Sequence, residues 1–176
     1  MASHDFRTKR ISFHGVMDMK KQPWKVYAFW ILLTEAVGAL SGWLTREGSR
    51  TFRDSVAQPP LSPPAIVFPI VWGILYGLMG FGIARIRLTS PSRARERASN
   101  VYIAQLILNF FWTLIFFNAQ AYGLAILWLG LLWALVLIMI LRFHRLDPLA
   151  GKLQIPYLLW LSFALYLNIG VWILNR

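Results

Sequence analysis

The sequence contains no cysteine, only three histidines and few acidic residues. The absence of Cys excludes a disulfide framework, a thiolate metal site and a Cys nucleophile. The histidines, His4, His14 and His144, lie far apart in the sequence, and the serines of the apolar segments have no evident His partner. A catalytic triad or a metal site cannot be assembled from such a set. We therefore predict no catalytic residue, no metal and no required cofactor.

Apolar residues dominate what is present. They make up 57% of the 176 residues, which is more apolar surface than a soluble domain of this size can bury. The net charge of +11 could suggest nucleic acid, but the basic residues lie in short segments between apolar runs. This pattern is typical of topology determinants in a membrane protein, so lipid is the expected partner and nucleic acid is not.

Five apolar runs follow a polar, basic N-terminal segment at 1–22, which lacks the features of a cleaved signal peptide. The runs lie at 23–44, 64–86, 100–117, 122–141 and 149–174. A membrane span needs roughly 20 apolar residues at about 1.5 Å each. The sequence therefore predicts an all-α membrane protein whose residues 23–176 form a five-transmembrane-helix bundle. The short connection at 118–121 predicts a tight antiparallel hairpin.

The basic residues are divided unevenly between the two sides of this bundle. Only four of the 18 Lys and Arg lie on one side, namely Arg46, Arg50, Arg53 and Arg176. Because Lys and Arg beside a span resist translocation, we predict a cytoplasmic N-terminus, with the C-terminus and the long loop at 45–63 outside. The expected location is a bacterial cytoplasmic membrane, with an outer mitochondrial membrane as the alternative.

One acidic residue, Glu35, lies near the middle of the first run. A charge there costs about 2.5–3.5 kcal/mol even on the mild insertion scale. Glu35 must therefore face the bundle and be paired or protonated. It is either a neutral acid hydrogen-bonded to Thr34, Ser41 or a neighbouring helix, or a functional group.

Small residues in the first two runs have the spacing that allows helix backbones to approach closely. They are Gly38 and Gly42 in the first run and Gly73 and Gly77 in the second. The close approach is either within the bundle or at a dimer interface.

Three runs carry stripes of aromatic and polar residues at helical spacing. The stripes are Phe68, Trp72 and Tyr76; Gln105, Asn109, Trp112 and Phe116; and Tyr157, Trp160, Ala164 and Asn168. Aromatic walls with a few hydrogen-bonding groups are typical of a small-molecule pocket. Interior packing would produce the same stripes, so the spacing leaves both interpretations open.

Several segments carry a resemblance to a known family. They are Pro59-Pro60-Leu61-Ser62-Pro63-Pro64, Phe68-Pro69-Ile70-Val71-Trp72, Leu75-Tyr76-Gly77-Leu78-Met79-Gly80, Asn109-Phe110-Phe111-Trp112 and Pro156-Tyr157-Leu158-Leu159-Trp160, with Phe163-Ala164 and Leu167-Asn168 after the last. The chain resembles the TspO/MBR family, also called translocator protein, tryptophan-rich sensory protein or peripheral-type benzodiazepine receptor, over about residues 23–174.

The resemblance implies a five-helix bundle, usually a homodimer, that binds protoporphyrin IX, haem and other flat hydrophobic molecules beneath a loop acting as a lid. The implied ligand-binding residues are Trp72, Asn109, Pro156, Tyr157, Trp160, Ala164 and Asn168, to which the stripes add Tyr76 and Trp112. The lid motif is Pro59, Pro60, Leu61, Pro63 and Pro64, within about 45–63.

The chain departs from the family pattern at several positions. Leu61 replaces the Trp of the lid motif, Phe52-Arg53 replaces a Trp-Tyr pair, and Trp128 replaces an acidic residue. No basic residue lies within five positions after Tyr166, so the cholesterol consensus is not met. We expect weaker aromatic contacts from the lid and no cholesterol binding.

Three functions fit these expectations. The first is a membrane sensor or regulator that binds porphyrin, the second a porphyrin or sterol carrier, and the third a light-dependent porphyrin-degrading activity in which an oxidisable Trp such as Trp72 takes part. Discontinuous helices are not evident, and Glu35 is the only candidate for an intramembrane relay. Binding is therefore the preferred prediction.

Overall fold

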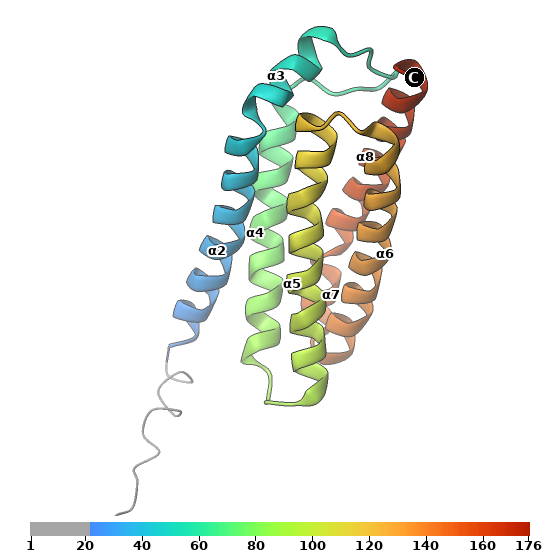
Figure 1. The fold of residues 1–176 in the computed structure, drawn as a ribbon. Helices are drawn as coiled ribbons and strands as arrows, with labels where there is room; N and C mark the ends of the chain where they lie inside the picture. Colours follow the sequence, from blue (N-terminus) through green and yellow to red (C-terminus); the bar gives the residue numbers. More distant parts are fainter. Residues whose placement is uncertain (1–21) are drawn as a thin grey trace, which may run out of the picture.

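The computed structural model describes residues 22–176, which form a bundle of long helices (Figure 1). These are α2 (Pro23–Leu44), α4 (Val67–Leu88), α5 (Arg93–Thr113) with its π-helical end η2 (Leu114–Asn118), α6 (Tyr122–Leu146) and α8 (Ile155–Leu174). Five segments of the described range are long and apolar enough to cross a membrane, and the same range contains no strand. The predicted all-α membrane fold is confirmed. The predicted segment 1–22 lies outside the described residues, apart from Gln22.

The bundle has two distinct ends (Figure 1). We call the end that carries residues 45–66, the η2–α6 connection and the C-terminus the lid end. The opposite end, here the far end, carries the start of α2, the α4–α5 connection and the short helix α7 (Pro148–Lys152). Because α5 and α6 run in opposite directions and pack against each other, the hairpin predicted from the short connection is confirmed.

The third span begins earlier than the apolar pattern predicts. Helix α5 starts at Arg93 rather than near residue 100, because the N–H of Arg95 donates to Oγ of Ser92 at 3.1 Å and this cap starts the helix within polar sequence. Helix α6 likewise continues to Leu146, beyond the predicted end at 141. In both cases the helix extends by polar turns beyond the apolar run, and hydropathy alone does not predict such an extension.

The fifth apolar run is two helices rather than one. Oδ1 of Asp147 accepts the N–H groups of Leu149 and Ala150 at 3.0 Å each and so starts α7, which ends at Lys152. Helix α8 begins at Ile155 with Pro156 in its first turn, where the missing N–H of proline leaves no hydrogen bond unmade.

The connection between α2 and α4 is not simply a loop. It contains helix α3 (Arg46–Ser55), followed by an irregular segment from 56 to 66. The sequence of α3 is polar, and its ring contacts come from Phe52, whose centroid lies 5.2 Å from that of Phe116 and 5.6 Å from that of Phe117 on η2. These contacts hold α3 across the lid end.

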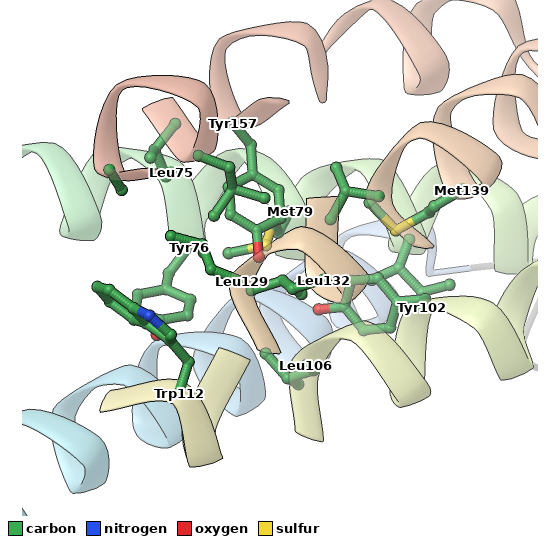
Figure 2. Close-up of a cluster of buried hydrophobic side chains, with 14 of the residues drawn as sticks. Leu75, Tyr76, Met79, Tyr102, Leu106, Trp112, Leu129, Leu132, Met139 and Tyr157 are labelled. Atoms are coloured by element: carbon green, nitrogen blue, oxygen red, sulfur yellow. The ribbon is translucent and has the colours of Figure 1, made fainter. Parts of the chain in front are cut away.

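The far half of the bundle is packed solidly (Figure 2). In Figure 2, Tyr102 and Met139 lie at one end of the buried cluster, and Tyr76 and Trp112 lie at the other. Met79 and Leu132 are fully buried between these ends (Figure 2), and the fully buried residues at and beyond the Tyr102 end are Ile83, Ile86, Ala98, Tyr102, Val136, Met139 and Phe143. Dense packing of this kind stabilises helices in lipid, where hydrophobic burial alone favours no helix contact.

Glycine packing differs from the sequence prediction. The backbones of α2 and α4 approach closely at Gly80, where a Cβ would lie 2.6 Å from Cα of Ile31. Gly38 does make room for a neighbour, the ring of Tyr76. Gly42 and Gly73, by contrast, have no neighbour within 4 Å of an added Cβ. At these two positions the close approach within the bundle, one of the two predicted alternatives, is not found.

Candidate ligand-binding cavity

The lid half of the bundle encloses a cavity of about 730 Å³. Its walls come from α2, α4, α5 with η2, and α8, and α3 with the following segment covers its mouth. Two of the glycines without neighbours, Gly42 and Gly73, lie in the wall and leave space in it. The same helices that fill the far half therefore leave a hollow beneath the lid.

Aromatic side chains form one wall of the cavity. Trp72 is central, since its ring centroid lies 5.5 Å from that of Tyr76 and 6.4 Å from that of Trp112. Phe68 and Phe116 extend this surface along α4 and η2. Helical spacing predicted these rings on one interior, and the structure brings them together.

Two residues of the wall present polar atoms without a protein partner. Asn168 is only 1% exposed, yet neither its Oδ1 nor its Nδ2 has a hydrogen-bond partner, and Nε1 of Trp112 is also buried and unpaired. An unsatisfied buried polar group costs about 1–3 kcal/mol. Because both residues line the cavity, these atoms are the candidates for orienting a ligand with a polar edge.

Asn109 and Tyr157 lie behind the aromatic wall rather than in it. The hydroxyl of Tyr76 donates to Oδ1 of Asn109 at 2.7 Å, and Nδ2 of Asn109 donates to the Tyr157 hydroxyl at 2.9 Å. That hydroxyl in turn donates to Oε1 of Gln105 at 3.0 Å. Both polar atoms of the Asn109 amide are engaged in this series of hydrogen bonds. Asn109 is therefore better placed to hold Tyr76 in position than to bind a ligand.

Pro156 and Trp160 line a different depression. It measures about 410 Å³, is almost wholly apolar and lies between α4 and α8. The Trp160 ring packs edge-on against Phe68, with centroids 5.9 Å apart, and so supports the cavity wall from outside. Of the predicted residues on α8, Ala164 and Asn168 alone reach the main cavity.

The lid motif is divided between the cavity and α8. Pro63 and Pro64 line the cavity, and Pro59 packs on Gly170, where an added Cβ would lie 2.5 Å from Cβ of Pro59. The carbonyl of Pro60 accepts a hydrogen bond from Tyr166 of α8. Leu61 is 79% exposed with φ of 67° and points away, which agrees with the expected loss of an aromatic lid contact.

The lid is also fastened by residues that sequence reasoning missed. Nδ2 of Asn175 donates to the carbonyl of Ala57 at 2.9 Å, and the N–H of Ala57 donates to Oδ1 of Asn175 at 3.0 Å. The hydroxyl of Tyr166 donates to the carbonyl of Pro60 at 2.9 Å. We call Asn175 and Tyr166 the latch. No spacing signal links positions so distant in the sequence.

The cavity wall contains two charged residues, Glu35 on α2 and Arg53 on α3. Glu35 is partly buried and faces the interior, as predicted, but the hydrogen bonds expected to Thr34 or Ser41 are absent. Thr34 instead shares a hydrogen bond with Tyr102, and Ser41 shares one with Thr113. Residues 22–176 contain no cluster of three His, Cys, Asp or Glu that could hold a metal.

Comparison with known proteins gives a consistent result. Residues 30–173 match the model of the TspO/MBR family. The "Tryptophan-rich protein TspO" of Chlorobaculum tepidum is 34% identical over 149 residues, which cover 84% of this chain and 94% of that protein. The "Translocator protein" of Bos taurus is 34% identical over 153 residues, covering 85% and 90% respectively. The "Tryptophan-rich sensory protein" of Cereibacter sphaeroides is 34% identical over 122 residues, covering 69% and 75%.

Proposed function

Because this chain belongs to the TspO/MBR family, we propose that it is an integral membrane protein that binds a tetrapyrrole, protoporphyrin IX or haem, and acts as a sensor or regulator. The observation that carries the proposal is the aromatic cavity of about 730 Å³ beneath the lid. Its volume lies within the range of about 300–1,000 Å³ usual for small-molecule sites.

The cavity lining suits a flat macrocycle with polar edges. Trp72, Tyr76 and Trp112 offer rings for stacking. Asn168 and Nε1 of Trp112 supply unpaired hydrogen-bonding atoms, while Arg53 on the lid helix α3 can pair with a carboxylate. The lining residues include no His, Met or Cys, the common axial ligands of haem iron, so the ring and its edges would carry recognition.

Binding is favoured over transport by the far half of the bundle. Below the cavity, side chains such as Met79, Ile83 and Tyr102 are fully buried and leave no continuous path to the far end within the described residues. A carrier needs alternate openings to the two sides, whereas a sensor needs one closed site.

Light-dependent degradation is the second candidate, because one observation favours it. Trp72 in the wall lies between oxidisable rings, with its centroid 5.5 Å from that of Tyr76 and 6.2 Å from that of Tyr157. An excited porphyrin beside Trp72 would have electron donors at hand. Porphyrin absorbance followed in light and in darkness distinguishes this activity from simple binding.

The proposal also includes an orientation and an assembly. We place the far end in the cytoplasm of a bacterium, since all but four of the 18 Lys and Arg belong to that side. A homodimer in the membrane is the proposed assembly. A Cys in place of Ser49 should react with an impermeant reagent in intact cells, and a Cys in place of Ser92 should not.

Fluorescence-quenching titrations with protoporphyrin IX test the binding site. Trp72→Ala should cause the largest loss of affinity, because truncating a buried aromatic costs about 3–5 kcal/mol in a packed core and a cavity wall should lose part of that. Asn168→Ala should lose less, about 0.5–1.5 kcal/mol for a neutral hydrogen bond. Trp24→Ala is the matched control, since Trp24 is 63% exposed and far from the cavity. Equal affinities for all three variants would reject the proposal.

A further inference from the structure

We propose that the same cavity binds lipophilic organic cations, such as an aryl quaternary ammonium ion, with Glu35 as the countercharge. This inference goes beyond tetrapyrrole binding and depends on the cavity, not on which tetrapyrrole occupies it. It follows from the position of Glu35, the surrounding rings and the arrangement of charge in the wall.

The carboxyl group of Glu35 lies against the backbone of α4. Its Oε1 would be 3.4 Å from a Cβ placed on Gly77, which is close to ordinary van der Waals contact, so the carboxyl lies beside Gly77 in the cavity wall. Among residues 22–176, no hydrogen bond or ion pair involves the carboxyl group of Glu35. An acid within a membrane span is stabilised by a partner, and the cavity is where a ligand could provide one.

Aromatic rings adjoin this acid. Gly38, one turn along α2 from Glu35, packs directly on the ring of Tyr76. The Tyr76 ring neighbours Trp72 at 5.5 Å, and Trp72 neighbours Trp112 at 6.4 Å between centroids. Faces of Tyr and Trp attract ammonium groups, most strongly where water is excluded. A carboxyl group beside several rings is the combination that recognises an organic cation.

The two charges of the wall are separated along the bundle. Glu35 lies nine residues before the end of α2, about 14 Å at 1.5 Å per residue, whereas Arg53 lies on α3 beyond that end. A cation is repelled beneath the lid and attracted at depth. Since no second acidic residue lines the cavity, a bare metal ion would lack ligands. An apolar cation fits both the charge and the walls.

A pair of isosteric probes tests this inference. Phenyltrimethylammonium and the neutral tert-butylbenzene have the same shape, and each is titrated by calorimetry into protein-containing and empty nanodiscs. Glu35→Gln should weaken binding of the cation about tenfold, which corresponds to roughly 1.4 kcal/mol, while the affinity for the neutral probe should fall less than twofold. Glu35→Asp keeps the carboxyl group on a shorter side chain, farther from the cavity, and should give an intermediate loss of cation affinity. Arg53→Gln should strengthen binding of the cation.

The outcomes are decisive in both directions. Equal cation affinities in wild type and Glu35→Gln, or equal losses for the two probes, would overturn the inference. Circular dichroism melts verify that each variant folds. If Glu35→Gln does not fold, the other two variants test the inference, since Glu35→Asp should weaken binding of the cation and Arg53→Gln should strengthen it. Titration of protoporphyrin IX into the wild-type protein tests the proposed function independently of the cation probes. A cation affinity that depends on Glu35 without porphyrin binding would reject the proposed function and keep this inference.

Discussion

The lid half and the far half of the bundle are built from the same helices but packed in opposite ways. In the far half, Ile83, Met139 and Phe143 have no exposed surface. In the lid half, the walls surround about 730 Å³ of space, and the buried amide of Asn168 has no partner. The comparison indicates that the far half supplies stability and the lid half supplies binding, because a densely packed region cannot also contain a cavity.

Matched truncations in the two halves should separate these contributions. Ile83→Ala in the far half should lower the free energy of unfolding by about 2–5 kcal/mol, towards the lower end because lipid is as apolar as the core. Leu167→Ala in the cavity wall should cost clearly less, since its side chain already adjoins open space. Unfolding in mild detergent, followed by circular dichroism, measures both. Equal losses would contradict the division into a solid and a hollow half.

One substitution placed at two positions of α4 sharpens the comparison. Gly80→Ala puts a Cβ 2.6 Å from Cα of Ile31 and should destabilise the protein by about 1–3 kcal/mol through overpacking. Gly73→Ala meets no atom within 4 Å and should be neutral or stabilising by about 0.5–1 kcal/mol, as expected for Gly to Ala in a helix. Thermal midpoints that fall equally in both variants would show that the cavity is not open at Gly73.

The sequence predicted the spans and part of the site for clear physical reasons. Hydrophobic length and periodicity placed all five spans and directed Trp72 and Tyr76 inward. Trp160 was assigned to the pocket because of its stripe, but at about 100° per residue it stands about 60° from Tyr157 and faces the outer depression. Residue type does not reveal pairing either, since Asn109 is engaged by two tyrosines and Asn168 by no residue.

A partly buried ion pair at the far end adds a dependence on pH, whereas the ion pairs of the lid half, Glu47 with Arg46 and with Arg50, are exposed. Nη2 of Arg85, in the last turn of α4, lies 2.8 Å from Oδ2 of Asp147, which lies between α6 and α7 and outside the spans. Burial alone would raise the pKa of Asp147, but Arg85 and the N–H groups of Ala150 and Leu149 outweigh it and hold the pKa below its ordinary value of 3.8. The carboxylate thus stabilises the fold above that value, and this stabilisation is lost as pH falls through the lowered pKa.

Asp147→Asn isolates that ion pair. Asn keeps the cap on α7 and removes the charge, so it should cost about 1.5 kcal/mol at neutral pH, the lower end for a hydrogen bond to a charged group. The difference from wild type should shrink below about pH 4, near the ordinary pKa of Asp. Thermal midpoints of both proteins at pH 7 and pH 3 measure the effect. A difference that does not change with pH would assign it to the cap instead.

Among these substitutions, the smallest effect on stability is expected at the latch. Asn175 holds the lid through two hydrogen bonds to Ala57 and makes a third to the carbonyl of Val171 within α8. The two bonds to Ala57 are exposed and the bond to Val171 is partly buried. Because water replaces most of the lost partners, Asn175→Ala should lower the free energy of unfolding by only about 0.5–1.5 kcal/mol.

Ligand kinetics should respond more than stability, because the latch acts on opening of the lid. If the closed lid is favoured by about 1.4 kcal/mol through Asn175, its removal increases the rate of ligand release about tenfold. Stopped-flow displacement of bound protoporphyrin IX measures that rate. Asn175→Asp, which can still accept from the N–H of Ala57 but cannot donate to its carbonyl, should give an intermediate rate, and Arg176→Ala is the neighbouring control. Unchanged release in Asn175→Ala would mean that Tyr166 and the Pro59–Gly170 contact hold the lid without it.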